Sequence, residues 1–178
     1  MTETFEASEW IPVEGGCDCG QVRYRLESPP LVVHCCHCRW CQRETGTAFA
    51  LNALIESDRV TKLAGEVALT RMPSQSGFGQ TIARCPECTV GLWSYYAGAG
   101  ALLSFVRVGS LDDPDRLPPD VHIFTESRQP WVVLTDDKPV FREYYRRSEV
   151  WSVASIARYD ALLPAIAEYK RERDAGRA

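Results

Sequence analysis

HCCHCRWCQ, residues 34–42, places four cysteines and two histidines in nine consecutive positions. Side chains of this kind at such density form disulfides, bind a metal ion or supply a reactive thiol. Each of these uses would fix the path of the chain on both sides of the stretch. The choice among them therefore decides the fold, and it depends on the other cysteines.

The cysteines of the chain are clustered in a way that favours metal binding. Structural cysteines normally occur singly, and cysteines one or two residues apart rarely reach the geometry of a disulfide. Thiolates on one short turn can converge on a cation, so we predict zinc, with iron as the competing metal. All eight cysteines belong to three groups: Cys17 and Cys19 in C-D-C, Cys36, Cys38 and Cys41 in C-H-C-R-W-C with Cys35 directly before them, and Cys85 and Cys88 in C-P-E-C.

The simplest division of these ligands gives two zinc sites. Cys17, Cys19, Cys85 and Cys88 would complete one tetrahedral site, here called the closed cluster. Four protein ligands leave no position for a substrate, so this site is expected to be structural. Its metal would then contribute to the free energy of folding.

Cys36, Cys38 and Cys41, here called the cysteine triad, leave one coordination position open. Three protein ligands plus water are typical of a catalytic zinc. In an extended segment residues i and i+2 share a face, and residue i+1 points away. If Cys36 and Cys38 face the metal, Cys35 and His37 therefore tend to face away from it. We therefore expect an open site. The alternative is that the fourth ligand is His34, Cys35 or His37.

Length and charge limit the protein class. A chain of 178 residues fits one domain and buries roughly 70% of its unfolded surface, so it needs no covalent cross-links. A net charge of −4 argues against a nucleic-acid or anionic-membrane partner. The acidic start MTETFEASEWIPVEGG has no apolar signal core, and no stretch is apolar enough to span a membrane. We expect a cytoplasmic protein with reduced cysteines.

Hydrophobic alternation predicts short strands separated by turns, and therefore a mainly antiparallel β architecture. Only the end of the chain, residues 155–175, has helical spacing, and Pro164 must kink that helix or begin a second one. We expect an N-terminal segment at 1–14, a zinc-binding β domain at 15–141, and a mostly helical C-terminal extension at 142–178 packed on that domain. The expected strands are at 20–28, 31–35, 47–57, 60–65, 66–72, 80–85, 92–96, 101–110, 121–127 and 130–134.

Five segments, taken in order, resemble the glutathione-dependent formaldehyde-activating enzyme family, which includes the centromere protein V-like domains. They are GGCDCGQVRY, CHCRWCQRETGTAF, CPEC, VRVGSLDDPD and HIFTESRQPWV, between Gly15 and about Leu134. The resemblance implies a β-tent-like zinc fold and the joining of formaldehyde to glutathione, formally a carbon–sulfur lyase activity. It also implies the same ligand division, with the closed cluster structural and the cysteine triad around the active metal.

One position departs from the family pattern. A glycine usually follows the second cysteine of the last pair, where this chain has Thr89 in CPECTVGLW. Glycine suits the left-handed backbone of a metal-binding turn, whereas a β-branched residue does not. We expect this turn to be reshaped or strained. Cys35 is an additional thiol to which the sequence assigns no role.

An open zinc would hold a small thiol such as glutathione as its thiolate beside a carbonyl carbon, and addition would give a hemithioacetal. Arg39 and Arg43 flank the cysteine triad and are candidates to bind a carboxylate of that thiol, or are ordinary solvated side chains. His122 is expected to be a hydrogen-bonded structural residue rather than a general acid, and Trp40 to pack rather than line a pocket. The rival hypothesis is a non-catalytic zinc module used for structure or interaction.

Overall fold

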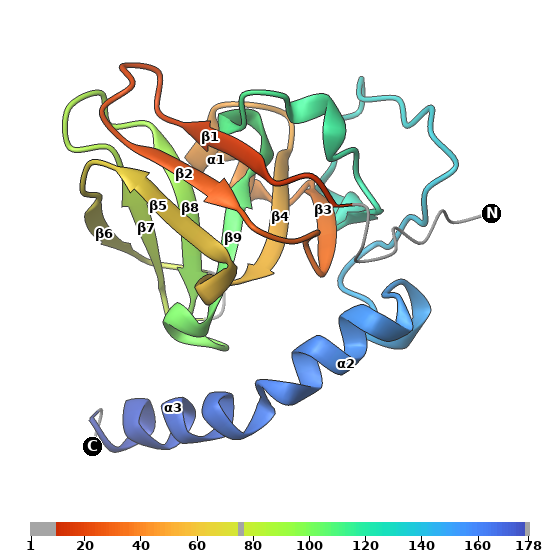
Figure 1. The fold of residues 1–178 in the computed structure, drawn as a ribbon. Helices are drawn as coiled ribbons and strands as arrows, with labels where there is room; N and C mark the ends of the chain where they lie inside the picture. Colours follow the sequence, from red (N-terminus) through yellow and green to blue (C-terminus); the bar gives the residue numbers. More distant parts are fainter. Residues whose placement is uncertain (1–9, 75–76, 177–178) are drawn as a thin grey trace.

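The computed structural model describes residues 10–74 and 77–176. The described part is mainly β, with helices at the C-terminal end, as the sequence predicts (Figure 1). The strands are β1 (Val13–Gly16), β2 (Arg23–Leu26), β3 (Val32–Cys36), β4 (Ala50–Glu56), β5 (Val60–Ala64), β6 (Ala68–Met72), β7 (Gln80–Arg84), β8 (Gly91–Tyr96), β9 (Leu103–Arg107) and β10 (Val121–Ile123), and the α-helices are α1 (Arg39–Thr45), α2 (Val153–Ala161) and α3 (Leu163–Ala175).

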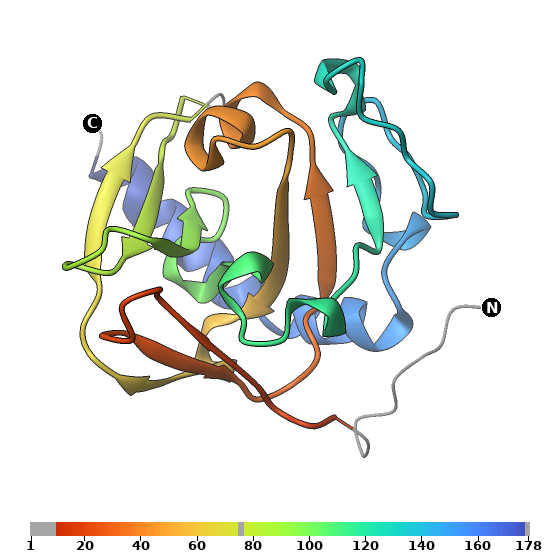
Figure 2. The same cartoon turned by 90° about the horizontal axis from the view of Figure 1, so that it is seen from above.

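The strands form two sheets. The smaller sheet has the order β1-β2-β5 and the larger one the order β10-β3-β4-β9-β8-β7-β6. Figure 2 shows the smaller sheet lying across one side of the strongly curved larger sheet. Every pairing is antiparallel except that of β10 with β3, which is parallel.

Two apolar cores lie on opposite faces of the larger sheet, and side-chain alternation along its central strands divides residues between them. Val33, Ala53 and Ile55 belong to the first core, beneath the smaller sheet. Val32 and Leu54 belong to the second core, which includes the C-terminal part of the chain. Strands β3 and β4 are therefore buried on both sides.

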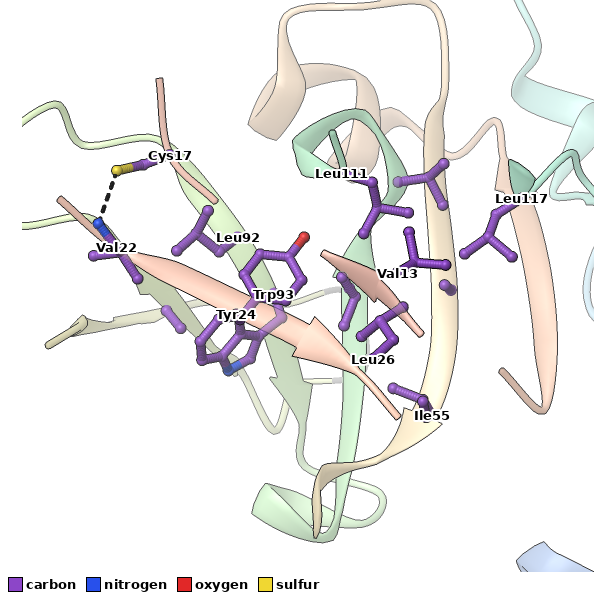
Figure 3. Close-up of a cluster of buried hydrophobic side chains, with 14 of the residues drawn as sticks. Val13, Cys17, Val22, Tyr24, Leu26, Ile55, Leu92, Trp93, Leu111 and Leu117 are labelled. Carbon is purple, nitrogen blue, oxygen red and sulfur yellow. Dashed lines mark hydrogen bonds between the residues drawn. The ribbon is translucent and has the colours of Figure 1, made fainter. Parts of the chain in front are cut away.

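The first core reaches the metal-ligand turn that follows β1. Figure 3 shows Tyr24 of β2 lying beside Leu92 and Trp93 of β8, with Cys17 next to Val22 at one end of the β1–β2 hairpin. The backbone N–H of Val22 donates to Cys17 Sγ at 3.2 Å, an interaction drawn in the figure. Packing of the hairpin thus positions the first cysteine of the closed cluster.

The structure corrects four expectations. Strand β1 was not predicted, because VEGG lacks the apolar alternation of a strand. Gly15 is required there by close packing: a Cβ at this residue would lie 2.6 Å from the carbonyl oxygen of Ser110. Helix α1 is too short to show helical periodicity. The expected strand at 121–127 ends at Ile123, because Phe124 takes a left-handed conformation with φ 54°. The expected strand at 130–134 is irregular and begins with a turn in which Val132 N–H donates to Gln129 O.

The C-terminal helices are joined at Leu162, and Pro164 lies in the first turn of α3. Pro164 therefore begins a second helix rather than kinking one, since proline lacks the N–H that a helix interior needs. Both helices run beneath the strands in Figure 1. The described helices are too short or too polar to cross a lipid bilayer.

Candidate metal centres and cavity

Two hairpin tips from different sheets bring the closed cluster together. The turn after β1 carries Cys17 and Cys19, and the turn between β7 and β8 carries Cys85 and Cys88. Their four sulfur atoms all lie within 4.8 Å of one another, with 3.5 Å between the sulfurs of Cys17 and Cys19 and 3.6 Å between those of Cys19 and Cys85. Tetrahedral zinc thiolates have sulfur separations of about 3.8 Å, so this donor set fits zinc.

The ionisation of the closed cluster also fits a cation. Backbone N–H groups of Val90 and Cys19 lower the pKa of Cys88 to about 6. The Gln21 backbone lowers the pKa of Cys19, but the neighbouring thiols outweigh it and raise the pKa to about 12. Four thiolates at this spacing repel one another unless a positive ion lies between them.

The cysteine triad is built where β3 passes into α1. Cys36 ends β3, Cys38 caps α1 by accepting from Cys41 N–H at 3.4 Å, and Cys41 lies inside the helix. The three sulfurs lie within 4.8 Å of one another. Among the described residues, this group of potential ligand atoms contains no fourth member.

The triad thiols cannot all ionise by themselves. The contacts of Cys38 with Cys36 and Cys41 lower the pKa of Cys38 to about 2. The same neighbours raise the pKa of Cys36 far above its usual range. The contact with Cys36 lowers the pKa of Cys41, but that with Cys38 and burial outweigh it and raise the pKa to about 11. A cation would remove this conflict, as expected for a metal-binding donor set.

A cavity of about 290 Å³ opens beside the cysteine triad. The volume is near the lower end of the roughly 300–1,000 Å³ typical of ligand pockets, so it suits a small molecule or the reacting end of a larger one. Its walls are mostly apolar, and Trp40 lines it rather than only packing elsewhere. The other lining residues are His34, Cys36, Cys38, Cys41, Glu44, Asn52, Ser74, Gln80, Tyr96, Phe105, Arg107, Ile123, Phe124 and Tyr144.

Arg107 is the cavity cation that sequence reasoning missed. It is buried at the end of β9 and donates to Asn52 Oδ1 and to Ser94 Oγ. Its charge favours the thiolate of Cys41, although the contact with Cys38 and burial outweigh it and the pKa of Cys41 stays raised. The available signal was a charged residue on the same strand face as Phe105, within an otherwise apolar run.

The two arginines selected from the sequence lie elsewhere. Arg39 and Arg43 are exposed on α1 and do not line the cavity. Arg39 donates to Gln42 Oε1 at 2.8 Å. Although Arg39 and Arg43 are close to the triad in sequence, their charges therefore do not lie at the open side of the triad.

Alternation along β3 turns Cys35 and His37 away from the triad, whereas His34 lies on the triad side but is not part of its group of ligand atoms. His34 faces the cavity, where Nε2 lies 2.6 Å from Tyr145 Oη. Burial lowers the pKa of His34 to about 4, so its ring is neutral. Cys35 and His37 belong instead to a separate group with His122. The expected hydrogen bonding of His122 is confirmed by its contact with Asp136.

Comparison with known proteins agrees with the resemblance. A profile described as "Glutathione-dependent formaldehyde-activating enzyme" matches residues 12–127. The chain belongs to the glutathione-dependent formaldehyde-activating enzyme family. The matched range contains all three cysteine groups, Arg107 and His122.

Relatives of this family member are distant. A Halomonas elongata protein, named provisionally as a glutathione-dependent formaldehyde-activating enzyme, is 27% identical over 126 residues, which are 68% of this chain and 80% of the relative. A crystal structure of a Rhodobacter sphaeroides protein gives a TM-score of 0.42 at 16% identity, covering 72% of this chain and 98% of that one. Membership of the formaldehyde-activating enzyme family points to glutathione-dependent activation of formaldehyde.

The triad of this formaldehyde-activating enzyme family member is braced by Gln42. The side-chain N–H₂ of Gln42 donates to His37 O at 2.7 Å and to Ser127 O at 3.0 Å. Gln129 then donates to Gln42 Oε1 at 3.0 Å. The segments CHCRWCQ and HIFTESRQPW are therefore linked directly, which fixes α1 against the loop that follows β10.

Proposed function

We propose that the chain is a zinc-dependent enzyme that adds a small thiol, such as glutathione, to formaldehyde or a similar small aldehyde. The formal class is a carbon–sulfur lyase, like S-(hydroxymethyl)glutathione synthase. The supporting observation is the three-sulfur group that faces a cavity, in a chain of this family. A purely structural zinc module has no use for such a cavity beside an incomplete ligand set.

The proposal includes two zinc ions, a structural one at the closed cluster and a catalytic-type one at the cysteine triad. It assigns a β-tent-like zinc fold to residues 15–141, flanked by the segment 1–14 and the extension 142–178. The catalytic residues are Cys36, Cys38 and Cys41. We also propose a cytoplasmic location, where thiols stay reduced, with neither nucleic acid nor membrane as partner.

The residues around the cavity have separate roles in this reaction. Zinc, when bound, supplies a positive charge that keeps an incoming thiol deprotonated. Trp40, Tyr96 and Phe105 exclude water from the space where the aldehyde would lie. Arg107 offsets the negative charge of the thiolates and offers N–H donors to a carboxylate or to the carbonyl oxygen.

The chemical step is an addition without oxidation or reduction. The sulfur electron pair forms the carbon–sulfur bond, and the π pair of the carbonyl group moves to oxygen. The proton that leaves the thiol ends on that oxygen, so the product is a hemithioacetal. The protein contributes by orienting the two reactants, which removes much of the entropic barrier.

Calorimetric titration of the zinc-loaded protein with glutathione tests the proposal. We expect binding at millimolar or lower concentration, and binding at least about tenfold weaker for S-methylglutathione, which cannot ionise at sulfur. Equal binding of both compounds, or no binding of glutathione to protein with an intact metal, would leave only the non-catalytic module.

Catalysis is tested by NMR exchange spectroscopy of glutathione with formaldehyde. We expect the protein to accelerate exchange between glutathione and its hydroxymethyl adduct, and Cys38→Ser to lose this acceleration. Circular dichroism of the variant checks its fold. A folded Cys38→Ser protein with full activity would exclude the triad as the active centre.

A further inference from the structure

A third group of ligand atoms lies behind β3, on the face opposite the cavity. It consists of Cys35 Sγ, His37 Nε2 and His122 Nδ1, all within 4.8 Å of one another. The three side chains are only 2%, 0% and 5% exposed, respectively. We propose that Cys35, His37 and His122 form a third metal site, which takes zinc and is structural.

The strand pairing explains why these residues meet. Cys35 and His122 are direct partners in the parallel register of β3 and β10. His37 follows one residue after β3 and, by alternation, lies on the same side as Cys35. Two neighbouring strands therefore present a sulfur and two ring nitrogens to one point.

The distances match a tetrahedral centre. Cys35 Sγ is 3.5 Å from His37 Nε2, and His37 Nε2 is 3.1 Å from His122 Nδ1. Tetrahedral zinc with ordinary bond lengths separates two nitrogens by about 3.4 Å and a nitrogen from a sulfur by about 3.6 Å. These two separations differ from the tetrahedral values by only a few tenths of an ångström, and the third pair, Cys35 Sγ and His122 Nδ1, lies within 4.8 Å.

Asp136 prepares His122 as a ligand. The carboxylate lies 3.0 and 3.1 Å from His122 Nε2 and can only accept, so Nε2 carries the proton. In the neutral ring that metal binding requires, His122 Nδ1 is then a bare lone pair directed at the group. A carboxylate on the outer nitrogen is the arrangement that orients metal-bound histidines in proteins.

In their neutral forms, the three side chains cannot satisfy one another by hydrogen bonding alone. If His37 Nε2–H donates to His122 Nδ1, the same nitrogen has no lone pair left for the Cys35 thiol. If His37 carries its proton on Nδ1, two lone pairs face each other at 3.1 Å. A cation between the three atoms accepts all of their lone pairs at once.

The donor set indicates which metal binds. One thiolate and two imidazoles suit zinc, whereas calcium and magnesium require oxygen ligands. The thiolate and the outer carboxylate of Asp136 together balance a divalent charge. No residue of this group lines the cavity, so the ion would tie β3 to β10 rather than meet a substrate.

Anomalous diffraction from crystals of the full chain, prepared with zinc, tests the site without altering any residue. Data collected on both sides of the zinc absorption edge should give a peak in contact with Cys35 Sγ, His37 Nε2 and His122 Nδ1. Absence of that peak would overturn the proposal, whether or not the closed cluster and the cysteine triad show theirs.

Metal content in solution gives a second test. Cys35→Ser and His122→Gln should each lose about one equivalent of zinc per chain. His34→Gln, a buried histidine on the other face of β3, is the matched control and should lose none. Unchanged zinc in both folded variants would contradict the third site. Cys38→Ser separates this inference from the proposed function, because it should lose triad zinc and thiol binding while keeping the third ion.

Discussion

Thr89 takes a backbone conformation, φ 62°, that β-branched residues rarely adopt. It completes the turn of the Cys85–Cys88 hairpin, where its N–H donates to Cys85 O at 3.1 Å. The family pattern has a glycine at this position, and the structure shows the reason. The turn keeps its left-handed shape, and the threonine is therefore strained. A non-glycine residue in this region costs about 1–2 kcal/mol.

We predict that Thr89→Gly stabilises the protein by about 0.5–1 kcal/mol, because the relieved strain exceeds the extra entropy of glycine in the unfolded chain. Urea unfolding of the zinc-loaded protein would measure the change. Thr70→Gly, at an exposed position of β6, is the matched control and should be destabilising. A loss of stability in Thr89→Gly would show that the turn is not strained.

Arg107 and Arg43 distinguish the site seen in the structure from the one expected from the sequence. We predict that Arg107→Met lowers kcat/KM for glutathione and formaldehyde by about 10- to 100-fold, because a buried charge-assisted interaction is lost. Arg43→Met should change it by less than about twofold, since its side chain is exposed outside the cavity. Steady-state kinetics of both variants test this prediction. A larger loss of kcat/KM in Arg43→Met than in Arg107→Met would assign the carboxylate-binding role to the arginine on α1.

At the scale of elements, helix α2 is held to the sheets by one buried ion pair. Arg158 donates from Nε to Glu56 Oε1 at 2.8 Å and also binds Pro29 O at 2.9 Å and Ser28 Oγ at 3.2 Å. Glu56 is only 4% exposed. The helix therefore closes over the end of β4 through a charge that has no access to water.

We predict that Arg158→Met destabilises the protein by about 1.5–3 kcal/mol, because the buried Glu56 carboxylate loses charge-assisted hydrogen bonds and keeps only the exposed Arg59, whose Nε lies 3.4 Å from Oε1. Arg171→Met is the control: it breaks an exposed pair with Glu168 within α3 and should cost less than about 0.5 kcal/mol. Denaturant unfolding measures both. Similar small effects in the two variants would mean that Arg59 alone is enough to stabilise the buried Glu56 carboxylate.

The closed cluster connects the β1–β2 hairpin of one sheet to the β7–β8 hairpin of the other. We predict that Cys19→Ser destabilises the protein by more than about 5 kcal/mol, because the proposed structural ion would be lost with its ligand. Asp18→Ser, in the same turn and exposed, should change stability by less than about 0.5 kcal/mol. Thermal unfolding with and without a chelator checks this, and a Cys19→Ser protein as stable as the parent would show that the sheets need no metal.

At the scale of the whole molecule, metal loading is coupled to proton release. In the metal-free triad at neutral pH, Cys36 and Cys41 keep their protons because their pKa values are raised, whereas Cys38 is ionised because its pKa is lowered to about 2. Zinc requires all three as thiolates, so binding displaces the two remaining protons. The sign follows directly: raising the pH favours binding and lowering it favours release.

We therefore predict that triad zinc affinity rises between about pH 6 and about pH 8, by up to roughly 100-fold per pH unit. Competition with a chromophoric chelator measures the affinity, and calorimetry in two buffers of different ionisation enthalpy counts the protons. The Cys38→Ser protein supplies the background from the other sites. An affinity independent of pH would mean that the triad is already fully ionised before the metal arrives.

The sequence by itself determined the features that depend on local spacing. The three groups of cysteines are read directly from their spacing along the chain. The separation of Cys35 and His37 from the triad, most strands and the helical C-terminal end follow from periods of two and 3.6 residues. Those periods are set by backbone geometry and are readable in a single segment. A reshaped or strained turn at Thr89 was also expected, because the resembled family usually has a glycine at this position, and the structure shows the strained form.

Only the tertiary structure decided which distant segments meet. Arg107 reaches the triad because β9 lies beside β4 in the larger sheet, and His122 meets Cys35 because β10 pairs with β3 in parallel. Neither of these two contacts can be read from the spacing of residues along the chain. The order of the strands is fixed by packing of the two cores and not by any one strand. The ligands within each segment can therefore be read along the chain, whereas the residues that surround each ligand depend on how the sheets pack together.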